Sequence, residues 1–226
     1  MVGSLNSLPA RIAGHPPAIG RHALGGTGRT GRLLAADLLA DGHDVAMLVR
    51  EPAKAATVAD RVTIAAGDIR DTAAVATAIN GADAVASALG PVVKDTTLLR
   101  DTAAIVVRAM GDAHVSRYVG ISGAGLTLPG DRKRNRDRII FWLLNSLGGM
   151  LAKDKIAERA IWQRSGLDWT LVRVPGLVDG AAREVDHDAH LSGRRTTLRR
   201  SDLARFITET VANGDYSRSS PFVSDR

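Results

Sequence analysis

The chain has 226 residues, of which 45% are hydrophobic and 24% are charged, and its formal net charge is +6. This composition is typical of a soluble globular protein with one domain and a sizeable core. The chain contains no cysteine, which excludes disulfides, thiolate metal sites and a cysteine nucleophile, and which fits a reducing cytoplasm. The positive charge favours anionic ligands in general and does not single out nucleic acid.

The beginning of the chain carries no pattern of a folded element. Residues 1–18 contain Gly, Ser, Asn and the pair Pro16-Pro17 without periodicity, and we expect a loose arm ahead of a single domain at 19–226. The first 20 residues lack the apolar core of a signal peptide, and the longest apolar runs are too short to span a bilayer. We therefore expect a cytoplasmic protein without a membrane partner.

A glycine-rich turn follows at residues 25–31, which read GGTGRTG. Gly25, Gly28 and Gly31 form a G-x-x-G-x-x-G pattern with leucines directly after it, as expected for a tight turn that opens a helix. Free amides at such a helix start lie at the positive end of the helix dipole, where a pyrophosphate fits. Gly31 shares a helical face with Leu34, which lets the helix pack closely on a sheet. An ordinary glycine-rich turn is the alternative, and the flanking elements decide between them.

The strand that should lead into this turn is poorly specified. Residues 18–24 read AIGRHAL, whereas a buried parallel strand is usually a run of Val, Ile and Leu. This is the main local inconsistency in the sequence. It bears on whether the pocket formed by the glycine turn is properly supported.

After the first helix, which ends at Asp41-Gly42, strand and helix patterns alternate. Such alternation implies right-handed crossovers and a parallel sheet. The predicted fold class is therefore α/β: a Rossmann-like doubly wound parallel sheet with helices on both faces and a small C-terminal substrate-side region. Strands are predicted at 44–49, 62–66, 82–88, 115–121, 167–174 and 222–223. Helices are predicted at 51–60, at 72–79 with a cap at Asp71 or Thr72, at 95–111, at 155–164, and from a cap at Ser201-Asp202 to 211.

Residues 126–150 interrupt the alternation with a basic run at 132–138 and an apolar run at 139–144. A basic run before an apolar one can lie on a membrane or bind a polyanion. We favour a solvated turn and a helix that packs over the sheet or forms a dimer contact, because the interleaved aromatics of a nucleic-acid groove are absent. Residues 186–190 (DHDAH) have metal-ligand side chains but no distant partner, and we predict a solvent loop and no metal site.

The second strand ends about 20 residues after the glycines, where a Rossmann fold places the residue that reads the adenosine ribose. Arg50 stands there, with Lys54 four residues further on. A carboxylate at this position would accept a hydrogen bond from the ribose 2′-hydroxyl of NAD, whereas cations attract the 2′-phosphate of NADP. We therefore expect NADPH to be preferred over NADH. Glu51 as a ribose ligand is the alternative.

Several segments, in their order along the chain, resemble one family. They are residues 25–31, Val49-Arg50, Gly67-Asp68-Ile69, Ser87-Ala88-Leu89-Gly90, Ile121-Ser122-Gly123-Ala124, residues 165–173 (SGLDWTLVR) and residues 200–204 (RSDLA). Together these segments resemble the NAD(P)H-binding, NmrA-like atypical short-chain dehydrogenases, and the resemblance covers roughly residues 23–224. Within these, the chain is similar to the biliverdin-IX-beta reductase/flavin reductase group. Each motif alone is weak evidence, whereas the joint order is fairly specific.

The resemblance implies a role for each matching position toward the cofactor NADP. The glycine turn would hold the pyrophosphate, Arg50 and Lys54 the 2′-phosphate, and Asp68 the adenine. The segment from Ala88 to Gly90 would pass under the nicotinamide ribose, and Ser122 would face the nicotinamide. The full set of implied cofactor-binding residues is Gly25, Thr27, Gly28, Arg29, Thr30, Gly31, Arg50, Lys54, Asp68, Ile69, Ala88, Leu89, Gly90, Ser122 and Pro175.

Ser122 and Lys155 are the candidate catalytic residues. Lys155 aligns with the lysine that many extended relatives place in a Y-x-x-x-K pair, but Leu151 stands at the tyrosine position. A phenol for alcohol–ketone chemistry is therefore missing. Reduction of a flavin or of biliverdin is less affected, because there the cofactor carries the hydride chemistry.

The resemblance thus implies an NAD(P)H-dependent reductase that acts on a flavin or another conjugated small-molecule acceptor. The alternative is an NmrA-type NAD(P)-binding regulator with little or no catalysis. Residues 123–152 and 176–197 would be the substrate-side segments. We expect a monomer or homodimer, with neither nucleic acid nor a membrane as a partner.

Overall fold

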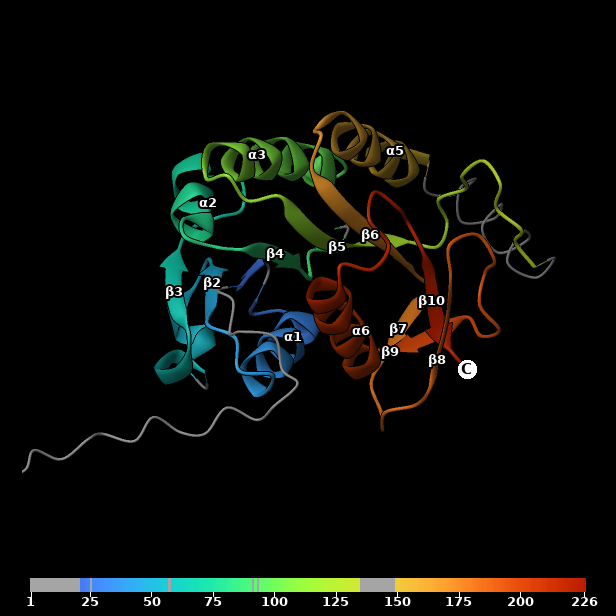
Figure 1. Ribbon diagram of the computed structural model, residues 1–226, viewed down its shortest axis with the longest axis horizontal. Helices are drawn as coiled ribbons and strands as arrows, with labels where there is room; N and C mark the ends of the chain where they lie inside the picture. Colours follow the sequence, from blue (N-terminus) through green and yellow to red (C-terminus); the bar gives the residue numbers. More distant parts are fainter. Residues whose placement is uncertain (1–20, 25, 57, 91, 93, 135–148) are drawn as a thin grey trace, which may run out of the picture.

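The computed structural model describes residues 21–24, 26–56, 58–90, 92, 94–134 and 149–226. Its main sheet has the strand order β3-β2-β1-β4-β5-β6-β10-β8 (Figure 1). Neighbouring strands are parallel from β3 to β10, and β8 is antiparallel to β10. The strands of this sheet are β1 (Arg21–Leu24), β2 (Val45–Val49), β3 (Thr63–Ala66), β4 (Ala84–Ser87), β5 (Arg117–Gly123), β6 (Asp168–Val174), β8 (Val185–Asp188) and β10 (Phe222–Asp225).

Helices cover both faces of the sheet. α2, α3 and α5 lie along one face, and α1 and α6 lie along the other (Figure 1). A small parallel sheet of β7 and β9 follows β6. The arrangement confirms the predicted doubly wound α/β fold. The helices are α1 (Arg29–Ala40), α2 (Thr72–Ile79), α3 (Leu98–Asp112), α5 (Gly149–Arg164) and α6 (Arg200–Asn213), and the short strands are β7 (Gly176–Val178) and β9 (Thr197–Arg199).

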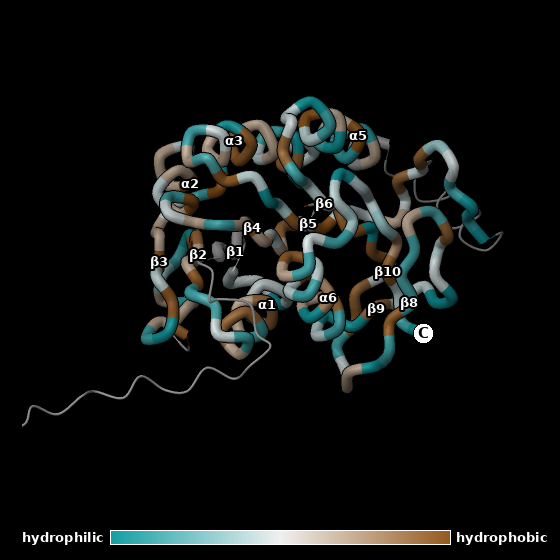
Figure 2. The backbone as a smooth tube through the Cα atoms, in the orientation of Figure 1, coloured by the Kyte–Doolittle hydropathy of each residue, from teal (hydrophilic) through white to brown (hydrophobic). Residues whose placement is uncertain are grey.

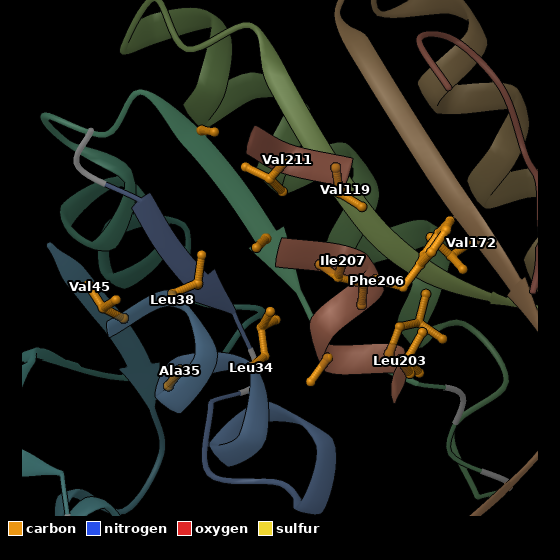
Figure 3. Close-up of a cluster of buried hydrophobic side chains, with 14 of the residues drawn as sticks. Leu34, Ala35, Leu38, Val45, Val119, Val172, Leu203, Phe206, Ile207 and Val211 are labelled. Atoms are coloured by element: carbon orange, nitrogen blue, oxygen red, sulfur yellow. The ribbon is translucent and has the colours of Figure 1, made fainter. Parts of the chain in front are cut away.

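The sheet separates two apolar clusters. Figure 3 shows the cluster beneath α1 and α6, in which Leu34, Leu38 and Ile207 lie over the strands. The second cluster lies beneath α2, α3 and α5 and includes the buried side chains of Trp162 and Trp169. Figure 2 shows hydrophobic stretches along the central strands and alternating colours around the helices. Each helix therefore buries one side on the sheet and exposes the other, as amphipathic surface helices do.

β1 forms at the centre of the sheet despite its weak sequence. Its backbone pairs in parallel with β2 on one side and β4 on the other, with Ala23 opposite both Met47 and Ala86. Pairing on both sides satisfies the backbone polar groups of the strand, and this tertiary environment outweighs its low β-propensity. The glycine turn is consequently supported by a central strand.

β5 is predicted at 115–121 and runs over Arg117–Gly123, so it ends two residues later than predicted. The prediction that Ser122 follows this strand is therefore wrong: Ser122 lies within it. β5 extends to Gly123 because its backbone pairs with β6 up to this residue, where Gly123 lies opposite Val174. Ser122 nevertheless stays near the carboxyl end of the strand.

Two predicted helices also differ from the structure. α5 begins at Gly149, well before the predicted start at Lys155. The predicted helix at 51–60 is wrong, since this stretch forms two 3₁₀ turns, η1 (Pro52–Ala55) and η2 (Ala59–Arg61). A segment of this length is too short to hold an α-helix without strong packing, and 3₁₀ turns are common in such connections.

The C-terminal region contains the remaining corrections. The predicted solvent loop at 186–190 is largely wrong, because its first residues belong to β8. The predicted cap at Ser201-Asp202 is also wrong: α6 begins at Arg200. The Asp202 carboxylate instead accepts the backbone N–H of Arg183 at 3.0 Å and so ties the preceding loop to the first turn of α6.

Three predictions fall on residues that the structure does not describe: the arm at 1–18, Gly25, and most of the basic and apolar runs at 132–144. Within the described ranges, no group of three His, Asp or Glu side chains could hold a metal ion. In the same ranges, no helix has the length and apolar character needed to cross a membrane.

A buried ion pair fixes the carboxyl end of β6. The Arg173 guanidinium donates to the Asp131 carboxylate at 2.5 and 3.0 Å, and both side chains are almost fully buried. Arg173 also donates to the carbonyls of Ala189 and Ser220, and it stacks 3.6 Å from the ring centroid of Phe222. One cation thereby joins the loop after β5, strand β6 and the C-terminal strand.

We predict that Asp131→Ala lowers the free energy of unfolding by about 3–5 kcal/mol, because it leaves a buried guanidinium without its charge partner. Urea denaturation followed by tryptophan fluorescence measures this change. Glu184→Ala is the matched control, since it breaks an ion pair with Arg226 in which both side chains are exposed and which contributes little. Equal losses in the two variants would contradict the role assigned to the buried pair.

Candidate functional site

The predicted site residues gather at the carboxyl edge of the parallel strands. In an open α/β sheet this edge binds ligands where the strand order reverses, and here the order reverses between β1 and β4. The glycine turn leaves β1 and the loop of Ala88, Leu89 and Gly90 leaves β4. The other predicted residues at this edge are Arg50 and Lys54 after β2, Asp68 and Ile69 after β3, Ser122 at the end of β5, and Pro175 after β6.

The first turn of α1 presents amide groups without acceptors. Gly28 is the N-cap residue, with extended backbone angles of φ −70° and ψ 167°, and no side chain caps the helix. Among the described residues, none accepts a hydrogen bond from the amides of Arg29, Thr30 or Gly31, and the first bond runs from Arg32 N–H to the Gly28 carbonyl at 3.0 Å. Such amides need an acceptor from outside the helix, and the helix dipole favours an anion there.

Close packing holds this turn against the sheet. Gly31, Leu34 and Leu38 are all buried, as their helical spacing predicts. Gly26 is buried as well, and a side-chain carbon added to it would collide with the side chain of Met47 in β2. Gly26 is not part of the G-x-x-G-x-x-G spacing, because it lies between Gly25 and Gly28, so the motif does not predict this contact.

Arg29 links the glycine turn to the loop after β7. Its guanidinium lies 3.7 Å from the carboxylate of Asp179, which also accepts from Arg200 at 2.8 Å. Arg200 in turn donates to the Leu177 carbonyl of β7. An anion at the start of α1 would therefore compete with Asp179 for Arg29.

The two predicted cations after β2 stand beside carboxylates. Lys54 donates to Glu51 at 2.7 Å, and this hydrogen bond is the main cause that lowers the pKa of Glu51. The Arg50 guanidinium lies 3.9 Å from the Asp68 carboxylate. These side chains are largely exposed. The structure thus brings Arg50 and Asp68 together, and it pairs Lys54 with Glu51.

Arg70 anchors the loop that carries Asp68. Its backbone N–H donates to the Asp68 carboxylate at 2.9 Å. Its guanidinium bonds Asp95, Thr97 and Asp101 near the start of α3. Hydrogen bonds from Arg70 to Asp95, and from Thr97 and Arg70 to Asp101, lower the pKa of both carboxyl groups. Sequence reasoning missed this network, because its acids lie far along the chain from Arg70.

Two serines mark the ends of β4 and β5. The buried Ser87 hydroxyl accepts the backbone N–H of Leu89 at 3.2 Å and so shapes the loop after β4. Ser122 is only 1% exposed, and its hydroxyl has no hydrogen-bond partner among the described residues. A buried hydroxyl without a partner is uncommon in proteins. Its place near the carboxyl edge fits a group that bonds a ligand.

Lys155 of α5 reaches the end of β5 across Gly123. A side-chain carbon added at Gly123 would collide with the Lys155 ammonium group, so the missing side chain makes room for the lysine. Burial lowers the pKa of Lys155, while the nearby acids Glu158 and Asp154 oppose this effect. Both candidate catalytic residues therefore reach the end of β5: Ser122 belongs to this strand, and Lys155 reaches it from α5.

Polar residues continue along α5 behind Lys155. The buried Asp154 carboxylate accepts the backbone N–H groups of Leu99 and Arg100 in the first turn of α3. Glu158 is buried, and burial raises its pKa to about 8. Sequence reasoning missed both residues, although their four-residue spacing with Trp162 indicates one buried helix face.

Comparison with known proteins gives a consistent result. Residues 25–214 match the profile of a protein family described as NAD(P)H-binding. The fold is similar to that of a protein from Burkholderia pseudomallei, with 24% identity, a TM-score of 0.72, and coverage of 91% of this chain and 99% of that chain.

Two further solved structures share the fold. One is a wide-type short-chain dehydrogenase/reductase from Veillonella parvula in complex with NADP, with 18% identity, a TM-score of 0.74, and coverage of 92% of this chain and 94% of that chain. The other is ChuY, an anaerobillin reductase from Escherichia coli, with 20% identity, a TM-score of 0.75, and coverage of 91% of this chain and 97% of that chain.

We predict that Gly123→Ala leaves the protein folded but displaces the Lys155 ammonium, because the flexible end of a lysine moves more easily than the strand. The displaced amine should react faster with trinitrobenzenesulfonate, as measured by mass spectrometry of the labelled peptides. Gly90→Ala is the control, since nothing lies within 4 Å of a carbon added there. Unchanged labelling of Lys155 in Gly123→Ala would contradict the placement of this side chain.

Proposed function

This chain belongs to the NAD(P)H-binding family, and we propose that it is a reductase that uses NADPH to reduce a flavin or another conjugated small-molecule acceptor. The observation that carries the proposal is the uncapped first turn of α1, placed where the strand order reverses. A pyrophosphate satisfies the free amides of such a turn and is attracted by the helix dipole.

The residues present fit a reduced nicotinamide dinucleotide at two separate points. The amides of the first turn of α1 are free at the pyrophosphate end, in the part of the chain that the structure describes. At the other end, the unpartnered hydroxyl of Ser122 lies near the carboxyl edge of β5. We assign Ser122 to a hydrogen bond with the nicotinamide amide, and the loop of Ala88–Gly90 to the adjoining ribose.

When bound, the dinucleotide supplies hydride, and the protein positions the acceptor and handles charge. Lys155 is suited to handle charge, because its ammonium lies at the end of β5 against Gly123, the residue after Ser122. It would donate to a ribose hydroxyl or stabilise negative charge that develops on the acceptor. Leu151 stands where a phenol would otherwise serve as a proton relay, which favours an acceptor that needs little protein-mediated proton transfer.

Turnover with model acceptors tests the proposal. Purified protein mixed with NADPH and either flavin mononucleotide or dichlorophenolindophenol should oxidise the nicotinamide, measured by its loss of near-ultraviolet absorbance. The name of the fold neighbour ChuY, an anaerobillin reductase, supports including a linear tetrapyrrole among the acceptors. If the protein binds NADPH but turns over none of these acceptors, the proposed reductase activity is contradicted.

That last outcome would favour a second function, an NAD(P)-binding regulator with little catalysis. Leu151 at the tyrosine position is the observation that supports it. The two functions differ in one measurement, because a regulator binds the dinucleotide in a calorimetric titration without consuming it.

We predict that the double variant Arg50→Ala/Lys54→Ala weakens NADPH binding by about tenfold or more and leaves NADH binding nearly unchanged, because charge-assisted bonds to a phosphate are lost. Calorimetric titration with both dinucleotides measures the difference. Arg108→Ala is the control, since it removes an exposed cation from the later part of α3. Equal losses for NADPH and NADH in the double variant would contradict a 2′-phosphate site at Arg50 and Lys54.

A further inference from the structure

Glu158 is a buried acid that the proposed reaction leaves without a role. Glu158 is only 4% exposed, and its Oε2 atom has no hydrogen-bond partner among the described residues. It lies one helical turn after Lys155 on α5, a spacing that places two side chains on neighbouring parts of the helix surface. An unpartnered buried carboxylate is unfavourable, so such a group favours its neutral form.

The path of α5 places Glu158 behind Lys155. α5 connects the parallel strands β5 and β6, so it runs back along the sheet from the carboxyl edge. Near that edge Lys155 lies over Gly123, and further back Trp162 stacks on Tyr118 of β5 with ring centroids 3.8 Å apart. Glu158 lies between these two contacts along the helix, on the inner side of the site.

We propose that Glu158 is a positioning residue that sets the net charge which Lys155 presents at the end of β5. As a neutral acid it leaves the Asp154 carboxylate as the nearby acid that offsets the ammonium, and as a carboxylate it adds a second negative charge beside Lys155. The inference rests on the proposed function, because a cation at this edge acts on an anionic dinucleotide or on a reduced acceptor.

Three titratable groups of the described chain interact with Glu158. Asp154 and Lys155 lie on α5, and Tyr118 lies on β5. α3 contributes the amides of its first turn, which the Asp154 carboxylate already accepts. Burial raises the pKa of Tyr118, so the phenol stays neutral.

These surroundings define the pH at which the charge changes. Burial and the charge of Asp154 raise the pKa of Glu158 to about 8, and Lys155 opposes the rise. Below this value Glu158 is neutral, and it does not offset the charge of Lys155. Above it the carboxylate appears, and the local charge falls by one unit.

Nuclear magnetic resonance of lysine methyl groups tests the inference without any cofactor. The chain has five lysines, and reductive methylation with carbon-13 gives each a resolved signal while its charge is kept; Lys155→Arg identifies the signal of Lys155. We expect this signal to show an inflection near the Glu158 pKa of about 8. The inflection should vanish in Glu158→Gln, which keeps the shape and cannot ionise, and persist in the exposed control Glu209→Gln. Its absence in the unmodified sequence, or its survival in Glu158→Gln, would overturn the inference.

Dinucleotide affinity supplies the second readout. Between pH 7 and pH 9 the affinity for NADPH should fall about three- to tenfold, as expected for the loss of one nearby charge in a partly screened site. Glu158→Gln should lack this fall, and Glu209→Gln should retain it. Equal falls in all three proteins would overturn charge control by Glu158. If NADPH does not bind at any pH, the proposed function fails, and the lysine titration still decides the role of Glu158.

Discussion

Burial of helices on both faces of one parallel sheet is the constraint on which the rest of this structure depends. Each helix buries one apolar side, so the chain must cross over the sheet after each strand and re-enter in the same direction. The strands from β1 to β6 therefore end at a common edge, and their outgoing loops meet there. The start of α1, Ser87 and Ser122 belong to distant parts of the sequence and reach one site for this reason alone. The topology therefore determines where the candidate site lies, and the side chains at this edge determine what it can bind.

The parts of the fold that periodic patterns encode were predictable. The apolar spacing of Gly31, Leu34 and Leu38 predicts the buried face of α1, and the structure buries all three. The alternation of elements predicts the doubly wound sheet, and the family match confirms its class. β1 was the weak point, because its position depends on pairing with β2 and β4 rather than on its own residues. Strand pairing of this kind is a property of neighbours, and a local pattern does not record it.

The candidate site was predictable only where a motif names its residues. The glycine turn and the cations after β2 lie where the spacing places them, and their roles toward the cofactor stay predictions. The partners of those residues depend on the folded chain: Asp179 meets Arg29, and Arg70 meets Asp101, across long sequence separations. The absence of a side chain at Gly123 has a structural meaning only in the folded chain, where α5 places the Lys155 ammonium in the space that a side chain would fill. Sequence motifs thus identify candidate binding groups, whereas the side chains that contact these groups are known only from the folded chain.

The buried charges of this protein show two different physical solutions. Arg173 lies in the interior, where its guanidinium donates hydrogen bonds to the Asp131 carboxylate and to several backbone carbonyls. Glu158 has no such set of partners among the described residues, and protonation is its way to avoid an isolated charge. Because its pKa is raised from 4.5 to about 8, the folded protein binds more protons than the unfolded chain between these values. The contribution of Glu158 to the free energy of unfolding therefore falls as the pH rises from 4.5 through about 8. An apolar residue would remove this penalty at alkaline pH. Among the described residues of α5, it would also remove an acid next to Lys155 whose pKa is raised to about 8, and strongly shifted groups of this kind are concentrated at functional sites.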